Sequence, residues 1–291
     1  MTPTRACGGP PTGPPRRALA RGGILPPVLS PERLTLSALT VGDVPFEERV
    51  AAAARAGFAG VGLRAEDYVI AREAGWDDDA MRGVLEAHGV VLGEVELLDA
   101  WSPLAPHRAK EETVFHVARA FGAPRVNAGL FQPRPLDEVV EDFGALCARA
   151  GELVVALEFM PFGGLPELST AWEVVRRAGA PNCGLLVDAW HWARAATTPD
   201  ALEAVPAERI VAVQLADVLE RPMEHAREET LHHRLAPGEG FGDVAGFVAA
   251  LRAHGVDAPI ALEVMTDELR ARGPDFAAER VMAGARVVLA G

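Results

Sequence analysis

The chain has 291 residues, of which 49% are hydrophobic and 24% are charged, and its formal net charge is −13. These proportions are typical of a globular protein, and no uninterrupted apolar run reaches the roughly 18 residues that a membrane-spanning helix requires. We therefore expect no membrane segment. Because the negative charge would repel phosphate backbones, we also expect no nucleic-acid partner.

Residues 1–31 differ from the rest of the chain, because they are rich in Pro, Gly and Arg and contain no acidic residue. This composition predicts a flexible tail. The remainder, 32–291, has the length of a single barrel domain, since α/β barrels of about 250 residues commonly form one domain. The three cysteines, Cys7, Cys147 and Cys183, form no Cys-x-x-Cys pair. They therefore indicate neither a disulfide framework nor a zinc knuckle, and they favour a reducing, cytoplasmic location.

From Leu34 onward, β-type runs alternate with amphipathic helical patterns. Eight strands are expected, at 34–39, 60–63, 90–96, 125–128, 153–158, 183–187, 210–215 and 259–263. Apolar residues three and four positions apart predict the helices between them, at 46–56, 78–88, 111–121, 136–150, 170–178, 244–254 and 275–289. The pattern is weaker after Asp188, where 200–204 is the helical candidate.

Several of these helices are followed by a glycine that precedes the next strand, as at Gly57, Gly89 and Gly255. Glycine adopts the left-handed conformation that ends a helix. The repeating order of strand, helix, glycine and strand predicts a parallel sheet, and eight such units favour closure into a (β/α)8 TIM barrel over an open doubly wound sheet. No Gly-x-Gly-x-x-Gly motif follows the first strand, so the main signal of a dinucleotide-binding fold is missing.

Four consecutive strands end in a side chain that carries an oxygen ligand: Glu158, Asp188, Gln214 and Glu263. Burying a carboxylate or carboxamide there is costly without a partner. Because the carboxyl ends of barrel strands meet at one face, we expect these oxygens to surround one divalent cation. Hard oxygen ligands suit Mg²⁺ or Mn²⁺ best, with Co²⁺ and Zn²⁺ as alternatives. The competing interpretation is that each residue caps a helix or pairs with an arginine.

These strand ends also resemble a known group, the sugar phosphate isomerase/epimerase group of the xylose-isomerase-like TIM barrel superfamily. The similar segments are 157–159 (LEF), 187–191 (VDAWH), 213–217 (VQLAD), 234–240 (RLAPGEG) and 262–263 (LE). The first half of the chain matches only in its alternation of elements and in Glu94 and Glu96. The group includes ketose epimerases, hydroxypyruvate isomerases, inosose dehydratases and dehydroshikimate dehydratases, so the resemblance implies the fold more closely than the reaction.

The resemblance implies that Glu158, Asp188, Gln214 and Glu263 bind the metal and that substrate oxygens complete its coordination. Many epimerases of the group have His at the third ligand position, whereas its hydroxypyruvate isomerases and several dehydratases have Gln, as here.

Removing a proton next to a carbonyl builds negative charge on the oxygen, which a divalent cation stabilises by several kcal/mol. Glu158 and Glu263, at opposite ends of the ligand set, are the acid/base candidates: one removes the proton, and the other returns a proton or helps water to leave.

Three further residues are candidates for substrate binding. His191 could reach a substrate hydroxyl, although a packed side chain between Trp190 and Trp192 is the alternative. Arg234 could bind a substrate oxyanion through two hydrogen bonds, or form a surface ion pair. Glu96, near the end of the third strand, is expected to line the opposite wall of the site or to cap a helix.

Two segments after the seventh strand are assigned supporting roles. Asp217 is expected to orient Gln214 or to anchor the following loop rather than to bind the metal, and the polar stretch 220–233 is expected to be a mobile loop over the site.

Aromatic residues cluster near the strand ends, and most such residues belong to the core. If several of them line the mouth of the site, the ligand carries a ring or another apolar body.

The sequence predicts a divalent-metal-dependent isomerase or epimerase that transfers a proton next to a carbonyl of a sugar, sugar-like or cyclitol substrate. The alternative is a lyase that uses the same base and metal to expel water from a polyhydroxylated ring ketone of the inosose or dehydroshikimate type, or that acts on a glycosylated aromatic compound. An apurinic endonuclease of the same superfamily would need more His ligands and a less acidic chain, and a non-catalytic metal-binding barrel is a further class. The expected partner is a small polyhydroxylated carbonyl compound. Barrels of this type often pair, so a homodimer is compatible with the sequence, although no diagnostic interface is visible.

Overall fold

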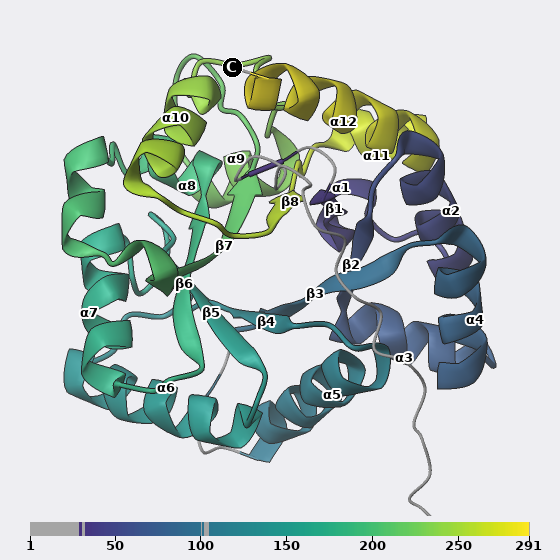
Figure 1. Ribbon diagram of the computed structural model, residues 1–291, viewed down its shortest axis with the longest axis horizontal. Coiled ribbons are helices and arrows are strands. Elements are labelled where there is room, and N and C mark those ends of the chain that lie inside the picture. Colours follow the sequence, from purple (N-terminus) through teal and green to yellow (C-terminus); the bar gives the residue numbers. More distant parts are fainter. Residues whose placement is uncertain (1–28, 31–32, 100, 102–104, 291) are drawn as a thin grey trace, which may run out of the picture.

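The computed structural model describes residues 29–30, 33–99, 101 and 105–290. In this part of the chain, eight parallel strands form a closed barrel in which neighbours follow chain order and β8 pairs with β1 (Figure 1). The strands are β1 (Thr35–Leu36), β2 (Gly60–Arg64), β3 (Val91–Leu98), β4 (Arg125–Ala128), β5 (Val154–Glu158), β6 (Cys183–Asp188), β7 (Ile210–Leu215) and β8 (Ile260–Leu262). The barrel predicted from the sequence is therefore confirmed.

Most of the expected tail lies outside the described residues. Of its positions, Leu29 and Ser30 are described, and both are buried. The carbonyl oxygen of Leu29 accepts a hydrogen bond from Nη2 of Arg252 at 3.4 Å. These two residues therefore pack against the barrel domain.

The long helices form an outer ring around the barrel, whereas the short helices α1, α8 and α9 lie inside that ring near the strands, as Figure 1 shows. The helices are α1 (Ala38–Val41), α2 (Phe46–Ala56), α3 (Ala65–Glu73), α4 (Asp78–His88), α5 (Ala105–Phe121), α6 (Leu136–Ala150), α7 (Leu168–Ala178), α8 (Ala189–Arg194), α9 (Ala226–His232), α10 (Val244–His254), α11 (Asp267–Arg272) and α12 (Pro274–Ala290), with the 3₁₀ turns η2 (Pro199–Ala204) and η3 (Ala207–Arg209). The bounds of α2, α4, α6 and α10 are those predicted. The glycines that end α2, α4 and α10 have φ of 88°, 66° and 86°, the left-handed conformation predicted for them.

Two predictions next to the site are wrong. The strand expected at 34–39 is limited to β1, because the side chain of Ser37 accepts a hydrogen bond from the backbone N–H of Leu39 and begins α1. The polar stretch 220–233 is not a loop throughout, because it contains α9, in which Glu229 and Thr230 are buried. Glu229 accepts a hydrogen bond from Nε of Arg194 at 2.7 Å. Its charge is thus neutralised inside the protein instead of being solvated.

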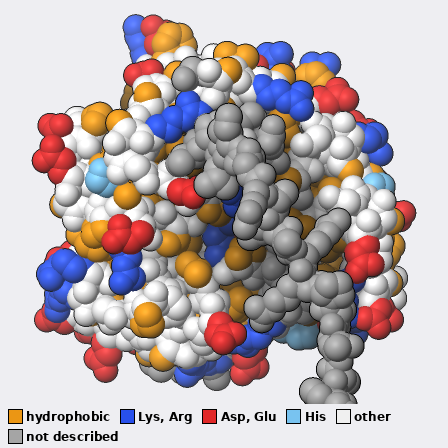
Figure 2. Space-filling model, in the orientation of Figure 1, with side chains coloured by type: hydrophobic (Ala, Val, Ile, Leu, Met, Phe, Trp, Pro, Cys, Tyr) orange, Lys and Arg blue, Asp and Glu red, His pale blue; other side chains and the backbone are white. Residues whose placement is uncertain are grey.

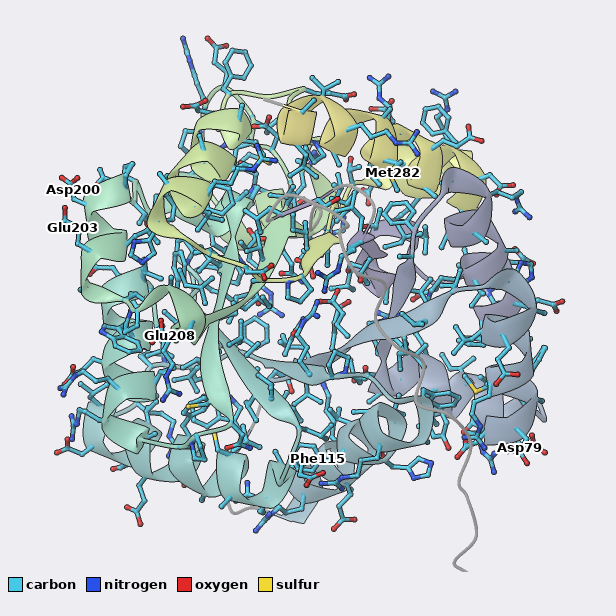
Figure 3. The ribbon with its side chains drawn as sticks, in the orientation of Figure 1. Asp79, Phe115, Asp200, Glu203, Glu208 and Met282 are labelled. Carbon is cyan, nitrogen blue, oxygen red and sulfur yellow. The ribbon has the colours of Figure 1, made fainter. Side chains whose placement is uncertain are left out.

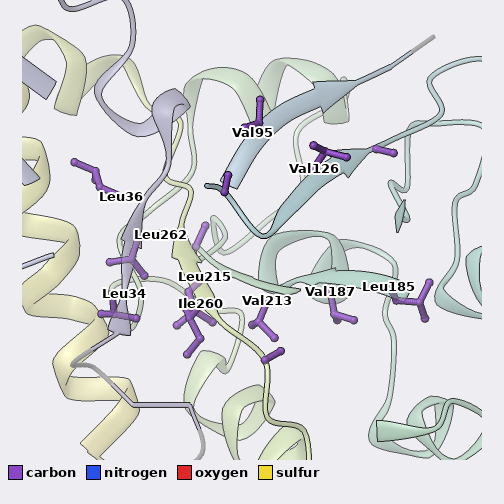
Figure 4. Close-up of a cluster of buried hydrophobic side chains, with 14 of the residues drawn as sticks. Leu34, Leu36, Val95, Val126, Leu185, Val187, Val213, Leu215, Ile260 and Leu262 are labelled. Atoms are coloured by element: carbon purple, nitrogen blue, oxygen red, sulfur yellow. The ribbon is translucent and has the colours of Figure 1, made fainter. Parts of the chain in front are cut away.

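Side chains alternate between the two sides of each barrel strand. The outward-facing residues of the strands join the helices in the main hydrophobic core, part of which is drawn in Figure 4. A second, smaller apolar cluster consists of Ala156, Leu186 and Ala212. Each member of it precedes a predicted metal ligand by two positions and therefore points to the same side of its strand. These three apolar side chains fill the interior of the barrel directly below the strand ends.

The negative net charge is distributed over the surface. On the face shown in Figure 2, acidic and basic side chains are interspersed. Asp79, Asp200 and Glu203 lie at the periphery in Figure 3, and these three residues and Glu208 are all exposed. Among the described helices, none combines the length and the apolar character needed to cross a membrane.

Candidate active site

The predicted metal ligands come together at the carboxyl ends of β5 to β8. Glu158 and Asp188 are the last residues of β5 and β6, Gln214 is the penultimate residue of β7, and Glu263 directly follows β8. All four side chains are buried. One oxygen from each of the three carboxylates lies within 4.8 Å of the others. The strand ends therefore focus three carboxylates on one point.

This donor set fits a divalent cation. Two oxygens that each lie 2.0–2.6 Å from one ion are at most about 5.2 Å apart, so the carboxylate spacing is compatible with shared coordination. Nε2 of Gln214 donates to Oε1 of Glu263 at 3.3 Å. Among the described residues, the buried Oε1 of Gln214 has no hydrogen-bond partner. A buried carbonyl oxygen without a donor is costly, and a cation would satisfy it.

Arg234 is buried beside the same carboxylates. Its Nη1 lies 3.0 Å from Oδ2 of Asp188 and 3.1 Å from Oε2 of Glu263. Its Nε and Nη2 donate to Oγ1 of Thr230 at 3.1 and 2.8 Å. Burial lowers the pKa of Arg234, but the carboxylates of Asp188 and Glu263 outweigh burial and raise the pKa. The surface ion pair considered for this residue is therefore wrong, because the side chain is only 1% exposed.

The Asp188 carboxylate also fixes the start of α8. Its Oδ1 accepts a hydrogen bond from the backbone N–H of His191 at 2.8 Å. Nε2 of His191 lies 3.1 Å from Oε1 of Glu158, although the two atoms are not aligned as a hydrogen bond and this oxygen has no other partner in the described part of the chain. The His191 ring packs edge-on against Trp190, with centroids 5.2 Å apart. His191 is thus a packed residue that also faces a predicted catalytic carboxylate.

Glu96 stands at the end of β3, beside the start of α1. Its Oε1 accepts hydrogen bonds from Oγ of Ser37 at 3.0 Å and from the backbone N–H of Ala38 at 3.3 Å. A Cβ atom added at Gly62 would lie 2.8 Å from this oxygen. The close approach therefore requires glycine at position 62. Both sequence interpretations of Glu96 apply, because it caps a helix and also lines the cavity described below.

Two carboxyl groups of the site have raised pKa values in the absence of a cation. Burial, followed by repulsion from Glu94, raises the pKa of Glu96 to about 8, even though a hydrogen bond with Glu263 opposes the shift. Burial likewise raises the pKa of Glu263 well above its usual range, against the opposing effect of Arg234. Burial thus favours the protonated form of both groups. A cation that binds here would displace protons, so its affinity should rise with pH.

One cavity joins these groups, and of the predicted site residues only Asp188 is absent from its lining. Asn127 adds a polar group: its Nδ2 donates to Oε2 of Glu94 at 3.0 Å, and its Oδ1 has no partner among the described residues. The apolar part of the lining includes Phe131 and Phe162, whose rings are nearly parallel with centroids 6.4 Å apart. The cavity lining therefore combines acidic and polar groups with aromatic rings.

The loop after β7 is held by Asp217. Its carboxylate accepts hydrogen bonds from the backbone N–H groups of Gly238, Gly240 and Gly242 at 3.0, 3.0 and 2.8 Å. The prediction that Asp217 anchors this loop is confirmed.

Sequence reasoning missed the contribution of α9 to the cavity. Arg227, Thr230 and Leu231 line it together with Arg234. The available signal is the spacing of the three α9 residues, because positions 227, 230 and 231 fall on one face of a helix. The polar composition of the stretch concealed that pattern.

Comparison with known proteins agrees with this architecture. The model of the family described as xylose isomerase-like TIM barrel matches residues 50–286, which is most of the chain. The protein therefore belongs to this family, as the resemblance in its strand ends implied. The chain is also similar to the crystal structure of the IOLI protein with a bound zinc atom, with a TM-score of 0.80 and 17% identity over 89% of this chain and 98% of the other.

Two curated relatives are similar in sequence over part of the chain. The 3-dehydroshikimate dehydratase of Pseudomonas aeruginosa is 40% identical over 101 residues, which are 35% of this chain and 16% of that protein. The 3-dehydroshikimate dehydratase of Pseudomonas putida is 32% identical over 136 residues, which are 46% of this chain and 21% of that protein. The matched segments thus span about a fifth or less of these two relatives.

Proposed function

We propose that the protein is a divalent-metal-dependent lyase that removes water from a polyhydroxylated ring ketone, with 3-dehydroshikimate as the substrate. The observation that carries the proposal is the set of three carboxylates and Gln214 beside a cavity that aromatic rings also line. Similarity to two 3-dehydroshikimate dehydratases supports dehydration over isomerisation. The isomerase or epimerase predicted from the sequence is the second candidate, because both reactions begin with loss of a proton next to a carbonyl.

The residues that would hold the cation are Glu158, Asp188, Gln214 and Glu263. When bound, the cation would polarise the ring carbonyl and stabilise the negative charge that develops on its oxygen. Arg234 holds Asp188 and Glu263 in place through its Nη1. The four side chains are buried, so little water competes for the site.

Glu158 is assigned as the base. The residue lines the cavity, and its buried Oε1 accepts no hydrogen bond in the described part of the chain. Proton removal from the carbon next to the carbonyl leaves an electron pair that forms a carbon–carbon double bond as the neighbouring carbon–hydroxyl bond breaks. The departing hydroxide takes up the proton that Glu158 removed and leaves as water, while Glu263 stays an ionised ligand of the cation. Tautomerisation of the ring then gives an aromatic dihydroxybenzoate.

The aromatic and polar walls suit such a substrate. The nearly parallel rings of Phe131 and Phe162 provide an apolar surface for a six-membered ring. Asn127 lines the same cavity, and its Oδ1, which has no partner among the described residues, could accept a hydrogen bond from a ring hydroxyl. A simple triose would leave the aromatic surface without a partner.

The experiment is a product analysis. Purified protein is freed of metal with a chelator, reloaded with Mg²⁺ or Mn²⁺, and incubated with 3-dehydroshikimate while near-ultraviolet absorbance and product mass are followed. We expect a new aromatic chromophore and loss of one water from the substrate mass, both abolished by the chelator. A product with the mass of the substrate would overturn the lyase assignment in favour of an isomerase. Metal binding without any product or exchange of substrate C–H protons in D₂O would indicate a non-catalytic barrel.

A further inference from the structure

The cavity that we assign to the substrate is strongly acidic. Glu96, Glu158 and Glu263 all line it, and His191 faces Glu158. Arg234 is the buried cation of the lining, but its guanidinium is already engaged with Asp188, Glu263 and Thr230. A substrate that carries a carboxylate would therefore need a separate cation to receive that group.

Arg227 supplies a separate cation. It lies on α9 and lines the same cavity, with its guanidinium carbon 5.3 Å from the centroid of the Phe131 ring. Within the described residues, this guanidinium has neither an ion pair nor a hydrogen bond. The other arginine discussed on this side of the barrel, Arg194, is instead paired with Glu229. The charge of Arg227 is thus available to a ligand.

The position of Arg227 suits one particular kind of ligand. Contact with the Phe131 ring restricts the plane of the guanidinium, so less conformational freedom is lost when it forms hydrogen bonds. A planar guanidinium matches a carboxylate through two parallel N–H···O bonds. Phe131 itself contacts Phe162, which extends the aromatic surface on which a ring would rest. The cation and the ring surface are therefore adjacent.

We propose that Arg227 binds the ring carboxylate of the substrate and so selects acidic ring ketones over neutral cyclitols and sugars. This inference rests on the proposed function, because it takes the substrate to enter the cavity with its carbonyl toward Glu158 and Glu263. The carboxylate then points to Arg227 on α9. A neutral polyol gains nothing from this residue, whereas a ring acid gains a hydrogen-bonded ion pair.

The test measures binding as well as turnover. Two ligands that differ only in the carboxylate, the dihydroxybenzoate product and catechol, are titrated into the Mg²⁺-loaded protein by calorimetry, and kcat and KM are measured with 3-dehydroshikimate. The variants are Arg227→Met, which removes the charge, and Arg227→Lys, which keeps it without the planar fork. Arg221→Met is the matched control, because Arg221 is exposed in the same connection and does not line the cavity.

We expect Arg227→Met to weaken dihydroxybenzoate binding and to raise KM by roughly 10- to 100-fold, the range for a lost hydrogen bond to a charged group. Catechol binding should be unchanged, Arg227→Lys should be intermediate, and Arg221→Met should match the wild type. Wild-type affinity for dihydroxybenzoate in Arg227→Met would overturn the inference, as would equal losses for both ligands. If the wild type binds dihydroxybenzoate through Arg227 but does not dehydrate 3-dehydroshikimate, the proposed function fails and the carboxylate site stands.

Discussion

The guanidinium of Arg234 lies 3.0 Å from the carboxylate of Asp188, and both groups are almost completely buried. The same nitrogen, Nη1, is 3.1 Å from Glu263. A charge this deep in the protein is tolerated because its partners are within hydrogen-bond distance. The pair therefore links the stability of the barrel to the charge state of the metal site.

Replacing Arg234 by Met should destabilise the chelator-treated protein by about 3–5 kcal/mol, because the buried carboxylates lose their counter-charge. Added Mn²⁺ should recover more stability in the variant than in the wild type, since a cation replaces the missing positive charge. Urea unfolding with and without metal measures both effects, and Arg234→Lys serves as the charge-preserving control. A variant as stable as the wild type without metal would contradict the assigned role of this ion pair.

Replacing Glu158 by Gln should lower kcat by roughly 10²- to 10⁴-fold at saturating metal, because the amide cannot accept the proton. The variant should retain the circular dichroism spectrum of the wild type. Glu152→Gln is a matched control, since Glu152 is exposed just before β5. A Glu158→Gln variant that dehydrates the substrate at the wild-type rate would assign the base elsewhere.

Replacing Asp217 by Ala should cost about 2–4 kcal/mol of unfolding free energy, because backbone N–H groups of Gly238, Gly240 and Gly242 lose their acceptor. Asp243→Ala provides the comparison: Asp243 begins α10 and accepts a single bond from Gly246 N–H, a cap worth about 1 kcal/mol. Chemical denaturation measures both variants. Equal losses for the two would mean that the carboxylate of Asp217 does not anchor the loop.

The ion pair between Asp67 and the fully buried Arg49, 2.8 Å apart, gives a pH-dependent stability. Burial raises the pKa of Asp67, but hydrogen bonds and attraction from Arg64 and Arg49 outweigh burial and lower it. A lowered carboxyl pKa stabilises the fold above the unfolded value of about 3.9 and loses this effect as pH falls through the folded value.

The change from Asp67 to Asn should therefore destabilise the protein by about 3–5 kcal/mol at neutral pH, and the difference from the wild type should shrink below about pH 4. Urea unfolding across this pH range measures the difference. The control is Asp43→Asn, since the Asp43 side chain is 88% exposed where it pairs with Arg64, and its change should be at most about 1 kcal/mol. A constant difference for Asp67→Asn down to low pH would exclude ionisation as its cause.

The fold was largely predictable because its signals are local. Apolar spacing marks α2 and α6, and the left-handed glycines that end α2, α4 and α10 are visible as Gly57, Gly89 and Gly255. The alternation of strand side chains also placed Glu158 and Gln214 on one side of the barrel, with a small apolar residue two positions earlier in each strand. These features depend only on neighbours along the chain.

The remaining features depend on contacts between distant residues. The shortness of β1 follows from Ser37, which caps α1 and meets Glu96, 59 positions away. The burial of α9 follows from the pairing of Glu229 with Arg194, and that of Arg234 from its contact with Asp188, 46 positions away. Glu229 and Arg234 are buried because a partner of opposite charge neutralises each of them, and Glu96 because it accepts hydrogen bonds. The sequence alone does not state which partners these are.

The most direct test of the metal site is anomalous X-ray diffraction from crystals of the protein soaked with Mn²⁺. We expect one strong anomalous peak roughly 2.0–2.6 Å from an oxygen of each of Glu158, Asp188, Gln214 and Glu263. Absence of a peak at these four residues under conditions that saturate the protein with Mn²⁺, or a peak held by other side chains, would contradict the account.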